Sequence, residues 1–254
     1  MKVLITGGTG FIGSRLALRC RETGDEVRVL AQENNPTEAR NRQLLEDSGV
    51  TVVVGSVTDS ERVAEVARGV DVVFHLAATQ HEMNVPDERF WTVNLHGTRN
   101  VLDAAAAAGV RRMIHGSTIG VYSRLEGLID ETSATEPDNI YGVTKLEGES
   151  TALSYDGKLP VVVIRIPEVY GPGDRRLLKL FKAIDRGTFF MIGAGRNVHH
   201  AIYVDDLVDA LLAAVDAPQA PGEVILLAGK EPVTTNEMVT HISGALGRRP
   251  PRVR

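Results

Sequence analysis

The sequence of 254 residues has one cysteine, no excess of positive charge and no long apolar run. Cys20 alone cannot form an internal disulfide framework, which fits a reducing compartment. The net charge of −5 at pH 7 argues against a nucleic-acid partner, because such a partner usually requires a basic face. The apolar runs fall short of the roughly 20 residues that cross a bilayer, and an apolar strand expected from Val3 leaves no room for a signal peptide. We therefore expect a cytoplasmic protein with no membrane partner.

The histidines do not form a metal-binding pattern. His199 and His200 are adjacent, so in a strand their side chains would point in opposite directions. No other Cys or His supplies the spacing typical of zinc sites, and we predict no metal.

Short apolar runs alternate with helical stretches over the first two thirds of the chain. Strands are expected at residues 2–6, 27–30, 51–54, 71–75, 112–115 and 161–166, and helices at 11–22, 60–68, 90–108 and from 141 onward. Near-continuous Val/Ile/Leu strands joined by helices are typical of a parallel sheet buried on both faces. The predicted fold class is α/β, with a doubly wound Rossmann sheet.

After Pro167, prolines and glycines divide the chain into shorter pieces. Helices are still expected at 207–215 and 236–246, and a strand at 224–227. We therefore predict a dinucleotide-binding domain over residues 1–166 and a mixed substrate-binding lobe over 167–254, interleaved with the end of the sheet.

Three glycines, Gly7, Gly10 and Gly13, stand between the first strand and the first helix. Their G-x-x-G-x-x-G spacing is one residue longer than the commoner dinucleotide fingerprint. It meets the same needs, which are a sharp turn, close backbone approach to a pyrophosphate and tight helix–strand packing. The N–H groups at the helix start, at Phe11 and Ile12, then face the anion. A purely structural glycine turn is the alternative interpretation.

The end of the second strand bears on the choice between NAD and NADP. An acidic residue there would bind the adenosine ribose hydroxyls and favour NAD, but Ala31 occupies that position and Glu33 lies further along. Arg40 and Arg42 are the candidates to meet a 2′-phosphate. The pattern favours NAD and leaves NADP open, with Ser56 as a candidate for the adenine.

Tyr141 and Lys145 form a second pattern. A tyrosine with its usual pKa of about 10 is a poor base near neutral pH. A lysine four residues later lies on the same helix face, and its charge favours the phenolate. Taken alone, a Tyr-x-x-x-Lys spacing is more often a half-buried tyrosine beside a solvated lysine.

Together, the glycine loop and this pair resemble the extended short-chain dehydrogenase/reductase family, the NAD-dependent epimerases and dehydratases, over residues 2–247. Further stretches that resemble the family are Phe74-His75-Leu76-Ala77-Ala78, residues 93–98 (VNLHGT), residues 117–122 (STIGVY) and residues 202–207 (IYVDDL). The resemblance implies hydride transfer between a substrate carbinol carbon and nicotinamide. Tyr141 would be the general base or acid, Lys145 would assist it, and Thr118 would hydrogen-bond the reacting oxygen.

The resemblance also implies two sets of binding residues. The cofactor-binding residues expected are Gly7, Gly10, Phe11, Ile12, Gly13, Ser56, Val57, Leu76, Ala77, Ala78, Tyr141, Lys145 and Pro167. The substrate-binding residues expected are Thr79, Thr118, Ile119, Glu168, Arg196 and His200. A homodimer through the helices at 90–108 and 141–155 is expected as well. Because the family's chains usually continue further, the lobe at 167–254 would be incomplete relative to theirs.

Two positions depart from the family pattern and leave the substrate open. His199-His200 stands where an Arg-Asp pair often grips a substrate diphosphate, and Glu168 stands where an Asn is common. A neutral imidazole binds a diphosphate less well than a bidentate guanidinium. The leading hypothesis is a nucleotide-sugar epimerase or dehydratase with bound NAD. The alternatives are an NAD(P)H-dependent ketone reductase or hydroxysteroid-type dehydrogenase, and a non-catalytic dinucleotide-binding regulatory protein.

Overall fold

The computed structural model describes residues 1–80, 85–123 and 127–250. Residues 251–254, the end of the predicted lobe, lie outside the described part. The described chain forms two compact units. The first contains Met1–Ile166 and Val208–Leu226, and the second contains Pro167–Leu207 and residues 227–250.

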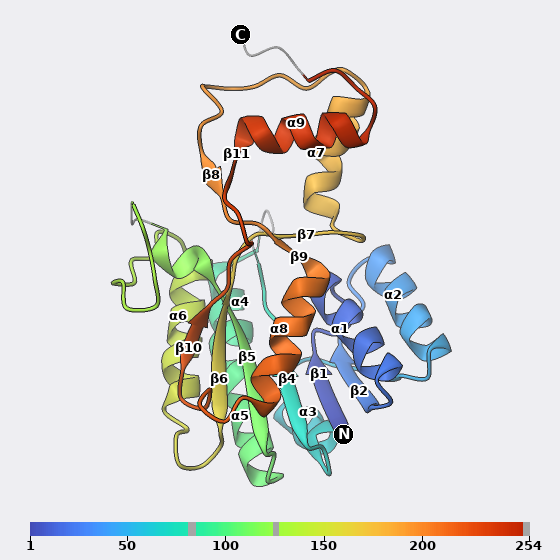
Figure 1. Ribbon diagram of the computed structural model, residues 1–254. Helices are drawn as coiled ribbons and strands as arrows, with labels where there is room; N and C mark the ends of the chain where they lie inside the picture. The colour runs from blue at the N-terminus through green and yellow to red at the C-terminus, as the bar shows by residue number, and fades with distance from the viewer. Residues whose placement is uncertain (81–84, 124–126, 251–254) are drawn as a thin grey trace. The chain divides into compact units, whose positions relative to one another are not determined.

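The first unit is built on a seven-stranded sheet of order β10-β6-β5-β4-β1-β2-β3, in which every neighbouring pair is parallel (Figure 1). Its strands are β1 (Lys2–Thr6), β2 (Glu26–Ala31), β3 (Thr51–Val54), β4 (Val72–His75), β5 (Arg112–Thr118), β6 (Val161–Ile166) and β10 (Val224–Leu226). The strand order reverses between β1 and β4, the place where ligands bind in such sheets. The predicted doubly wound α/β fold is confirmed.

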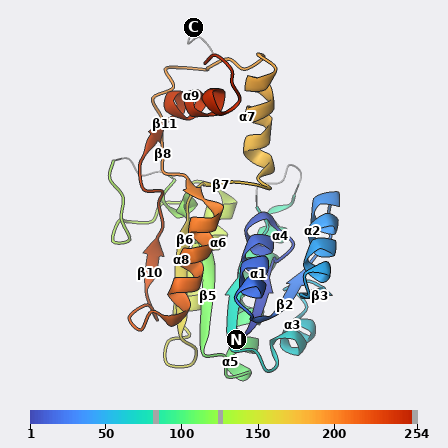
Figure 2. The same cartoon turned by 45° about the vertical axis from the view of Figure 1, so that its right-hand side comes forward.

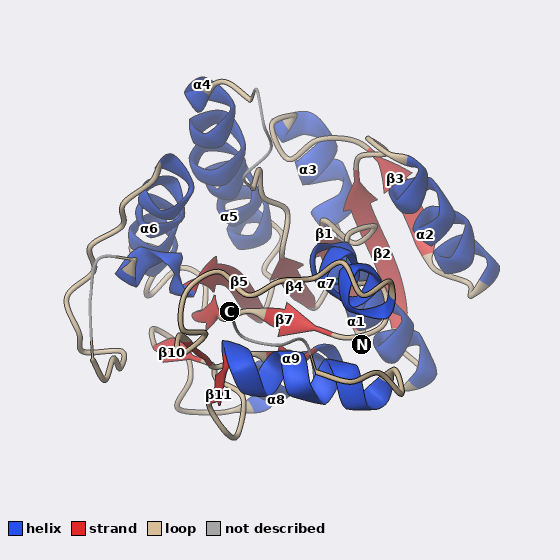
Figure 3. Cartoon of the chain, turned by 90° about the horizontal axis from the view of Figure 1, so that it is seen from above, coloured by secondary structure: helices blue, strands red, loops and turns tan. Residues whose placement is uncertain are grey.

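Helices cover both faces of this sheet, as Figure 3 shows from above. The helical segments are α1 (Phe11–Glu22), α2 (Pro36–Asp47), α3 (Ser60–Ala67), α4 (Asp87–Phe90), the π-helical η1 (Trp91–Gly97), α5 (Thr98–Ala107), the 3₁₀ turn η2 (Ile119–Tyr122), α6 (Ile140–Leu153) and α8 (Val204–Asp216). Helices α3, α5 and α6 line one face, while α1 and α8 line the other. An ion pair between Arg19 of α1 and Asp209 of α8 joins the latter two at 2.7 Å.

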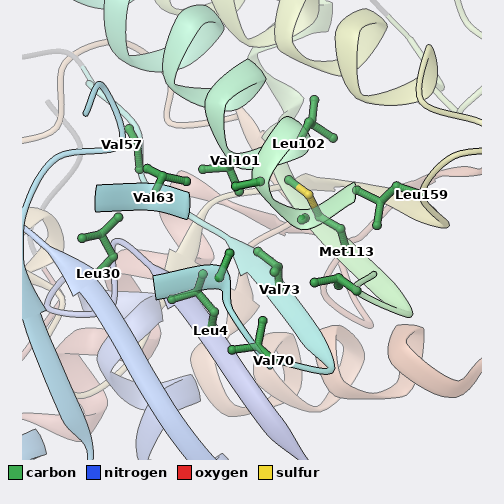
Figure 4. Close-up of a cluster of buried hydrophobic side chains, with 14 of the residues drawn as sticks. Leu4, Leu30, Val57, Val63, Val70, Val73, Val101, Leu102, Met113 and Leu159 are labelled. Atoms are coloured by element: carbon green, nitrogen blue, oxygen red, sulfur yellow. The ribbon is translucent and has the colours of Figure 1, made fainter. Parts of the chain in front are cut away.

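One continuous apolar cluster lies between the sheet and the α3–α5 layer (Figure 4). Leu4 and Val73 from the strands, Val63 from α3 and Leu102 from α5 are all fully buried in it. Burial of such side chains contributes roughly 25 cal/mol per Å² of apolar surface removed from water. This packing gives the carboxyl ends of the strands a rigid base.

The second unit contains two short strand pairs and two helices. Strands β7 (Val169–Tyr170) and β9 (Ile202–Tyr203) pair in parallel, and β8 (Val198–His199) and β11 (Val233–Thr234) pair antiparallel. Helices α7 (Arg175–Asp185) and α9 (Thr235–Ala245), visible in Figure 2, pack through a small apolar cluster around Ile184, Val239 and Ile242. Asp174 and Thr234 cap the two helix starts with side-chain hydrogen bonds.

Several elements differ from the sequence prediction. The helix expected at 90–108 begins earlier, at Asp87, and contains the π-helical stretch η1. The strand expected at 112–115 continues to Thr118, because Gly116 and Ser117 still pair with β6. Helices α2 and α7 were not predicted. Helix α2 is polar over most of its length, and Leu45 is its one buried residue. Helix α7 does have the i, i+3, i+4, i+7 apolar spacing of a helix, at Leu177, Leu180, Phe181 and Ile184, and the prediction missed this signal.

Candidate active site

The glycine loop follows β1 and packs against the backbone at the end of β4. Gly7 has a φ of 72°, and a Cβ at this residue would lie 2.8 Å from the backbone nitrogen of Ala77. The Thr6 side chain fixes the same junction, because its Oγ1 lies 2.7 Å from His75 Nδ1 and accepts a hydrogen bond from Ala77 N–H at 3.3 Å. The loop therefore comes as close to β4 as two backbones allow, which only glycine permits.

Helix α1 begins directly after this loop. Gly10 is its N-cap and supplies no side-chain hydrogen bond, and the first turn has no acidic residue. The N–H groups of Phe11, Ile12 and Gly13 belong to the first turn, where backbone donors have no partner within a helix. Together with the helix dipole they offer an anion a binding site at the carboxyl edge of the sheet. A pyrophosphate fits this cradle.

The segment after β2 bears on the cofactor's adenosine half. Arg42, from α2, pairs with Glu33 at 3.3 Å and with Glu46 at 2.9 Å. Two carboxylates therefore neutralise the guanidinium of Arg42, which was a predicted candidate to bind the 2′-phosphate of NADP. Arg40 donates to Thr37 Oγ1 at 3.2 Å on the same helix.

The expected cofactor residues after β3 and β4 lie at the same carboxyl edge. Ser56 Oγ lies 2.8 Å from Thr58 Oγ1. Val57 is buried, and its carbonyl accepts a hydrogen bond from Asn100. Leu76 N–H donates to Thr6 O at 3.2 Å, so the stretch Leu76-Ala77-Ala78 continues along the glycine loop.

Tyr141 stands in the first turn of α6, which packs onto the turn after β5. The N-cap Asn139 accepts a hydrogen bond from Gly142 N–H at 2.9 Å. A Cβ on Gly142 would lie 2.7 Å from Gly120 O, so the helix start and η2 are in close contact. Thr118, the last residue of β5, caps η2 by accepting from Gly120 N–H at 3.0 Å. Sequence positions 118 and 141 thus belong to two segments in direct contact, and Ile119 beside them is exposed.

Lys145 is buried, with 2% of its surface exposed. Its Nζ donates to Gly116 O of β5 at 2.6 Å. Burial lowers the pKa of Lys145 to about 8, and the nearby Glu149 carboxylate opposes that shift. The alternative interpretation of the Tyr-x-x-x-Lys spacing, in which the lysine is solvated, is therefore wrong for this helix.

Asn94 connects three segments of the site from the π-helical stretch η1. Its Oδ1 accepts from Thr79 N–H at 2.8 Å, and its Nδ2 donates to Thr79 O and to Thr144 Oγ1, each at 3.0 Å. Asn94 is fully buried. It therefore fixes the backbone of the expected substrate residue Thr79 to the helix that carries Tyr141 and Lys145. π-Helical stretches such as η1 are frequent at functional sites.

The remaining expected residues belong to the second unit. Pro167 is buried, whereas Arg196 and His200 are exposed. The Glu168 side chain is 52% exposed and pairs through Oε2 with Nδ1 of His199 at 2.8 Å. The other ring nitrogen of His199 lies 3.0 Å from Thr235 Oγ1.

Three further buried residues near Lys145 were not among the predicted site residues. Glu149 and Arg165 form a buried ion pair at 2.7 Å, and Ser117 Oγ donates to Glu149 Oε1 at 2.5 Å. Glu149 stands four residues after Lys145, so the same spacing that singled out Tyr141 and Lys145 reaches it. Arg165 carries no local signal within its apolar strand.

Two buried histidines interact electrostatically with Lys145. His75 bonds to Thr6 and to Thr98, and its pKa is lowered to about 3 by burial and by the charge of Lys145. Burial also lowers the pKa of His115 far below its usual value, again with a contribution from Lys145. Both imidazoles are therefore neutral at physiological pH.

Within the described ranges no group of three or more His, Cys, Asp or Glu side chains is placed to hold a metal ion. None of the helices in the same ranges has the length and apolar character needed to cross a bilayer.

The parallel sheet and the glycine cradle at its switch point define a dinucleotide-binding protein of the Rossmann class. Residues 3–228 match the NAD dependent epimerase/dehydratase family, and the chain belongs to this family. The resemblance drawn from the motifs is thereby confirmed.

Relatives within the family carry different activities. A 3-beta-hydroxysteroid dehydrogenase from Mycolicibacterium neoaurum is 30% identical over 271 residues, covering 100% of this chain and 72% of that protein. A UDP-glucose 4-epimerase from Vibrio cholerae is 30% identical over 257 residues, and the match covers 97% of this chain and 76% of the epimerase. Among solved structures, the UDP-glucuronic acid 4-epimerase from Bacillus cereus in complex with UDP-glucuronic acid and NAD has a TM-score of 0.89 at 27% identity. That match covers 99% of this chain and 85% of the epimerase.

Proposed function

We propose that this protein is an NAD-dependent epimerase or dehydratase acting on a nucleotide-linked sugar, with Tyr141 as the proton-transferring residue. The observation that carries the proposal is the position of Lys145, buried at the carboxyl end of β5 and one helical turn from Tyr141. A buried cation in this place favours the phenolate form of the tyrosine. Thr118 would donate a hydrogen bond to the reacting oxygen.

The chain's own residues support NAD as the cofactor. Gly7 packs so closely on the Ala77 backbone that a Cβ would collide with it, and the first turn of α1 presents N–H donors for the pyrophosphate. The pairing of Arg42 with two carboxylates disfavours a 2′-phosphate, because that phosphate would have to displace Glu33 or Glu46. When bound, NAD supplies the hydride acceptor and donor. Tyr141 accepts the hydroxyl proton as the carbinol carbon is oxidised, and returns it when the ketone is reduced.

Structural relatives support the substrate class. The Bacillus cereus epimerase was solved with UDP-glucuronic acid and NAD, and the dehydratase DesIV from Streptomyces venezuelae is a dTDP-glucose 4,6-dehydratase. We propose that residues of the second unit, including Arg196 and His200, contact the substrate.

A ketone reductase or hydroxysteroid-type dehydrogenase is the second candidate function. The half-exposed Glu168 carboxylate, paired with His199, favours it. A negative charge near the substrate would disfavour a diphosphate and would be harmless to an uncharged ketone.

Turnover and cofactor retention separate the two candidates. The protein is passed through gel filtration, and bound NAD is measured by absorbance after denaturation. It is then assayed with UDP-glucose and UDP-glucuronic acid, and separately with NADH or NADPH and steroid-like or aryl ketones. Retained NAD with conversion of a UDP-sugar supports the epimerase. Cofactor that washes out, with ketone-dependent oxidation of the reduced nucleotide, contradicts it, and binding without turnover would indicate a regulatory protein.

Tyr141→Phe tests the proton-transfer role in either reaction. We expect kcat to fall by about 10²–10⁴-fold, the usual contribution of a general acid–base residue. Tyr155→Phe is the matched control, since Tyr155 lies two residues after the end of α6 and its hydroxyl donates to Asp103 of α5. Full activity of Tyr141→Phe would exclude the assignment.

We also propose a homodimer through the exposed faces of α5 and α6. Sedimentation equilibrium tests it, and a monomer at micromolar concentration would contradict it.

A further inference from the structure

A cluster of buried charges lies one helical turn along α6 from Lys145. The side chains of Glu149 from α6 and Arg165 from β6 are 3% and 7% exposed. Arg165 Nη2 donates to Glu149 Oε2 at 2.7 Å, and its Nε lies 3.1 and 3.2 Å from the two carboxylate oxygens. Ser117 Oγ donates to Oε1 as well. The Glu149 carboxylate is therefore held in one orientation by several hydrogen bonds.

The far side of Arg165 is equally well packed. Its Nη1 donates to the Tyr122 hydroxyl, and its guanidinium carbon lies 4.8 Å from the centre of the Tyr122 ring. Such a cluster is a poor device for stability alone, because the cost of desolvating two charges often exceeds their attraction. Its position suggests another reason for its presence.

The cluster and Lys145 are tied to consecutive residues of one strand. Lys145 Nζ donates to Gly116 O, and Glu149 accepts from Ser117. Residues 141, 145 and 149 are spaced by four, so the tyrosine, the ammonium and the carboxylate follow one face of α6. The order along this face is proton acceptor, cation and anion.

Among the residues that the structure describes, no second carboxylate contributes to the charged form of Lys145. His75 and His115, from β4 and β5, are neutral, and both His115 ring nitrogens are buried without a hydrogen-bond partner. Arg165 is a cation that Glu149 already neutralises. Glu149 is the carboxylate that raises the pKa of Lys145 against the effect of burial.

We propose that Glu149 is a positioning residue that keeps Lys145 in its charged form, with Arg165 and Ser117 fixing the carboxylate. The proposal rests on the function assigned above to Tyr141, because the charge of Lys145 matters through the tyrosine. Loss of Glu149 would lower the fraction of Lys145 that is charged near neutral pH, and the phenolate of Tyr141 would lose part of the charge that favours it.

A titration of Lys145 tests the proposal without any activity assay. The sequence contains six lysines, so protein labelled with ¹³C at lysine Cε gives few NMR signals. The signal missing from Lys145→Arg identifies residue 145. In Glu149→Gln we expect the titration midpoint of Lys145 to fall by about one pH unit or more, the usual effect of one close opposite charge.

Glu147→Gln is the matched control, since Glu147 is an exposed carboxylate on the same helix. It should leave the Lys145 midpoint unchanged. Glu149→Gln leaves Arg165 buried without its partner, so the double variant Glu149→Gln/Arg165→Met, which removes both charges, is measured as well. A wild-type midpoint for Lys145 in Glu149→Gln or in the double variant would overturn the proposal.

The pH dependence of activity gives a second readout. In Glu149→Gln the pH of half-maximal oxidation should move upward, because Tyr141 then ionises without a neighbouring cation. A purely structural role would lower the rate equally at every pH, and that result would also overturn the proposal. If instead Tyr141→Phe keeps full activity, the proposed function fails, while the Lys145 titration still decides the role of Glu149.

Discussion

Gly7→Ala tests the contact that makes the glycine loop a cofactor cradle. A Cβ at Gly7 would lie 2.8 Å from Ala77 N, 2.9 Å from Ala77 Cα and 3.0 Å from the carbonyl carbon of Leu76. All three atoms belong to the backbone after β4, in the middle of the sheet. No side chain can rotate away, so the loop or the strand end must move.

The cost has two parts that a second glycine separates. Gly69 has a φ of 68°, close to the 72° of Gly7, but nothing lies within 4 Å of a Cβ placed there. Gly69→Ala should therefore show the left-handed backbone cost alone, about 1–2 kcal/mol. Gly7→Ala should show this cost plus overpacking against backbone, about 1–3 kcal/mol more.

Urea unfolding of both variants measures the two costs, and titration calorimetry measures NAD affinity. We expect Gly7→Ala to be the less stable variant and to bind NAD at least about tenfold more weakly, equivalent to about 1.4 kcal/mol. Gly69→Ala should bind NAD as the wild type does. Equal losses of stability in the two variants would refute the collision argument, and unchanged NAD affinity in Gly7→Ala would refute the role of the loop.

Two further predictions concern buried polar residues. The folded-state pKa of His75 is about 3 against an ordinary 6.5. Between these pH values His75 is protonated in the unfolded chain but stays neutral in the folded chain. The contribution of His75 to the free energy of unfolding is therefore complete above pH 6.5 and falls as the pH is lowered, by roughly 3 kcal/mol at pH 4. In urea unfolding, His75→Gln should lose less stability than the wild type between these pH values. An equal loss in the two proteins would show that His75 does not cause it. Asn94→Ala leaves the N–H and carbonyl of Thr79 without their partner, so unfolding free energy should fall by about 2–4 kcal/mol and kcat/KM should fall as well. Wild-type stability of Asn94→Ala would show that water replaces these bonds.

The sheet was largely predictable because each of its strands is marked by an apolar run in the local sequence. The bounds of β1, α1, β3 and β6 agree with the prediction, since each strand is an apolar run and a glycine loop marks the start of α1. Helix α2 escaped prediction because its surface is mostly polar, whereas α7 has an apolar face, with Leu180, Phe181 and Ile184, that the prediction missed. The π-helical stretch around Asn94 also has no local signal, because the hydrogen bonds that accompany it reach Thr79 and Thr144.

The glycine spacing and the four-residue step from Tyr141 to Lys145 were determined by the sequence alone, because both depend on neighbours along the chain. Tertiary structure decided what Lys145 experiences. Lys145 is buried and bonds to Gly116, which is 29 positions away in the sequence. The nearby carboxylate of Glu149 is held by Arg165, 16 positions away. Spacing along a helix says which side chains share a face, but only the strands packed against that face decide whether a charge on it meets water or a buried partner.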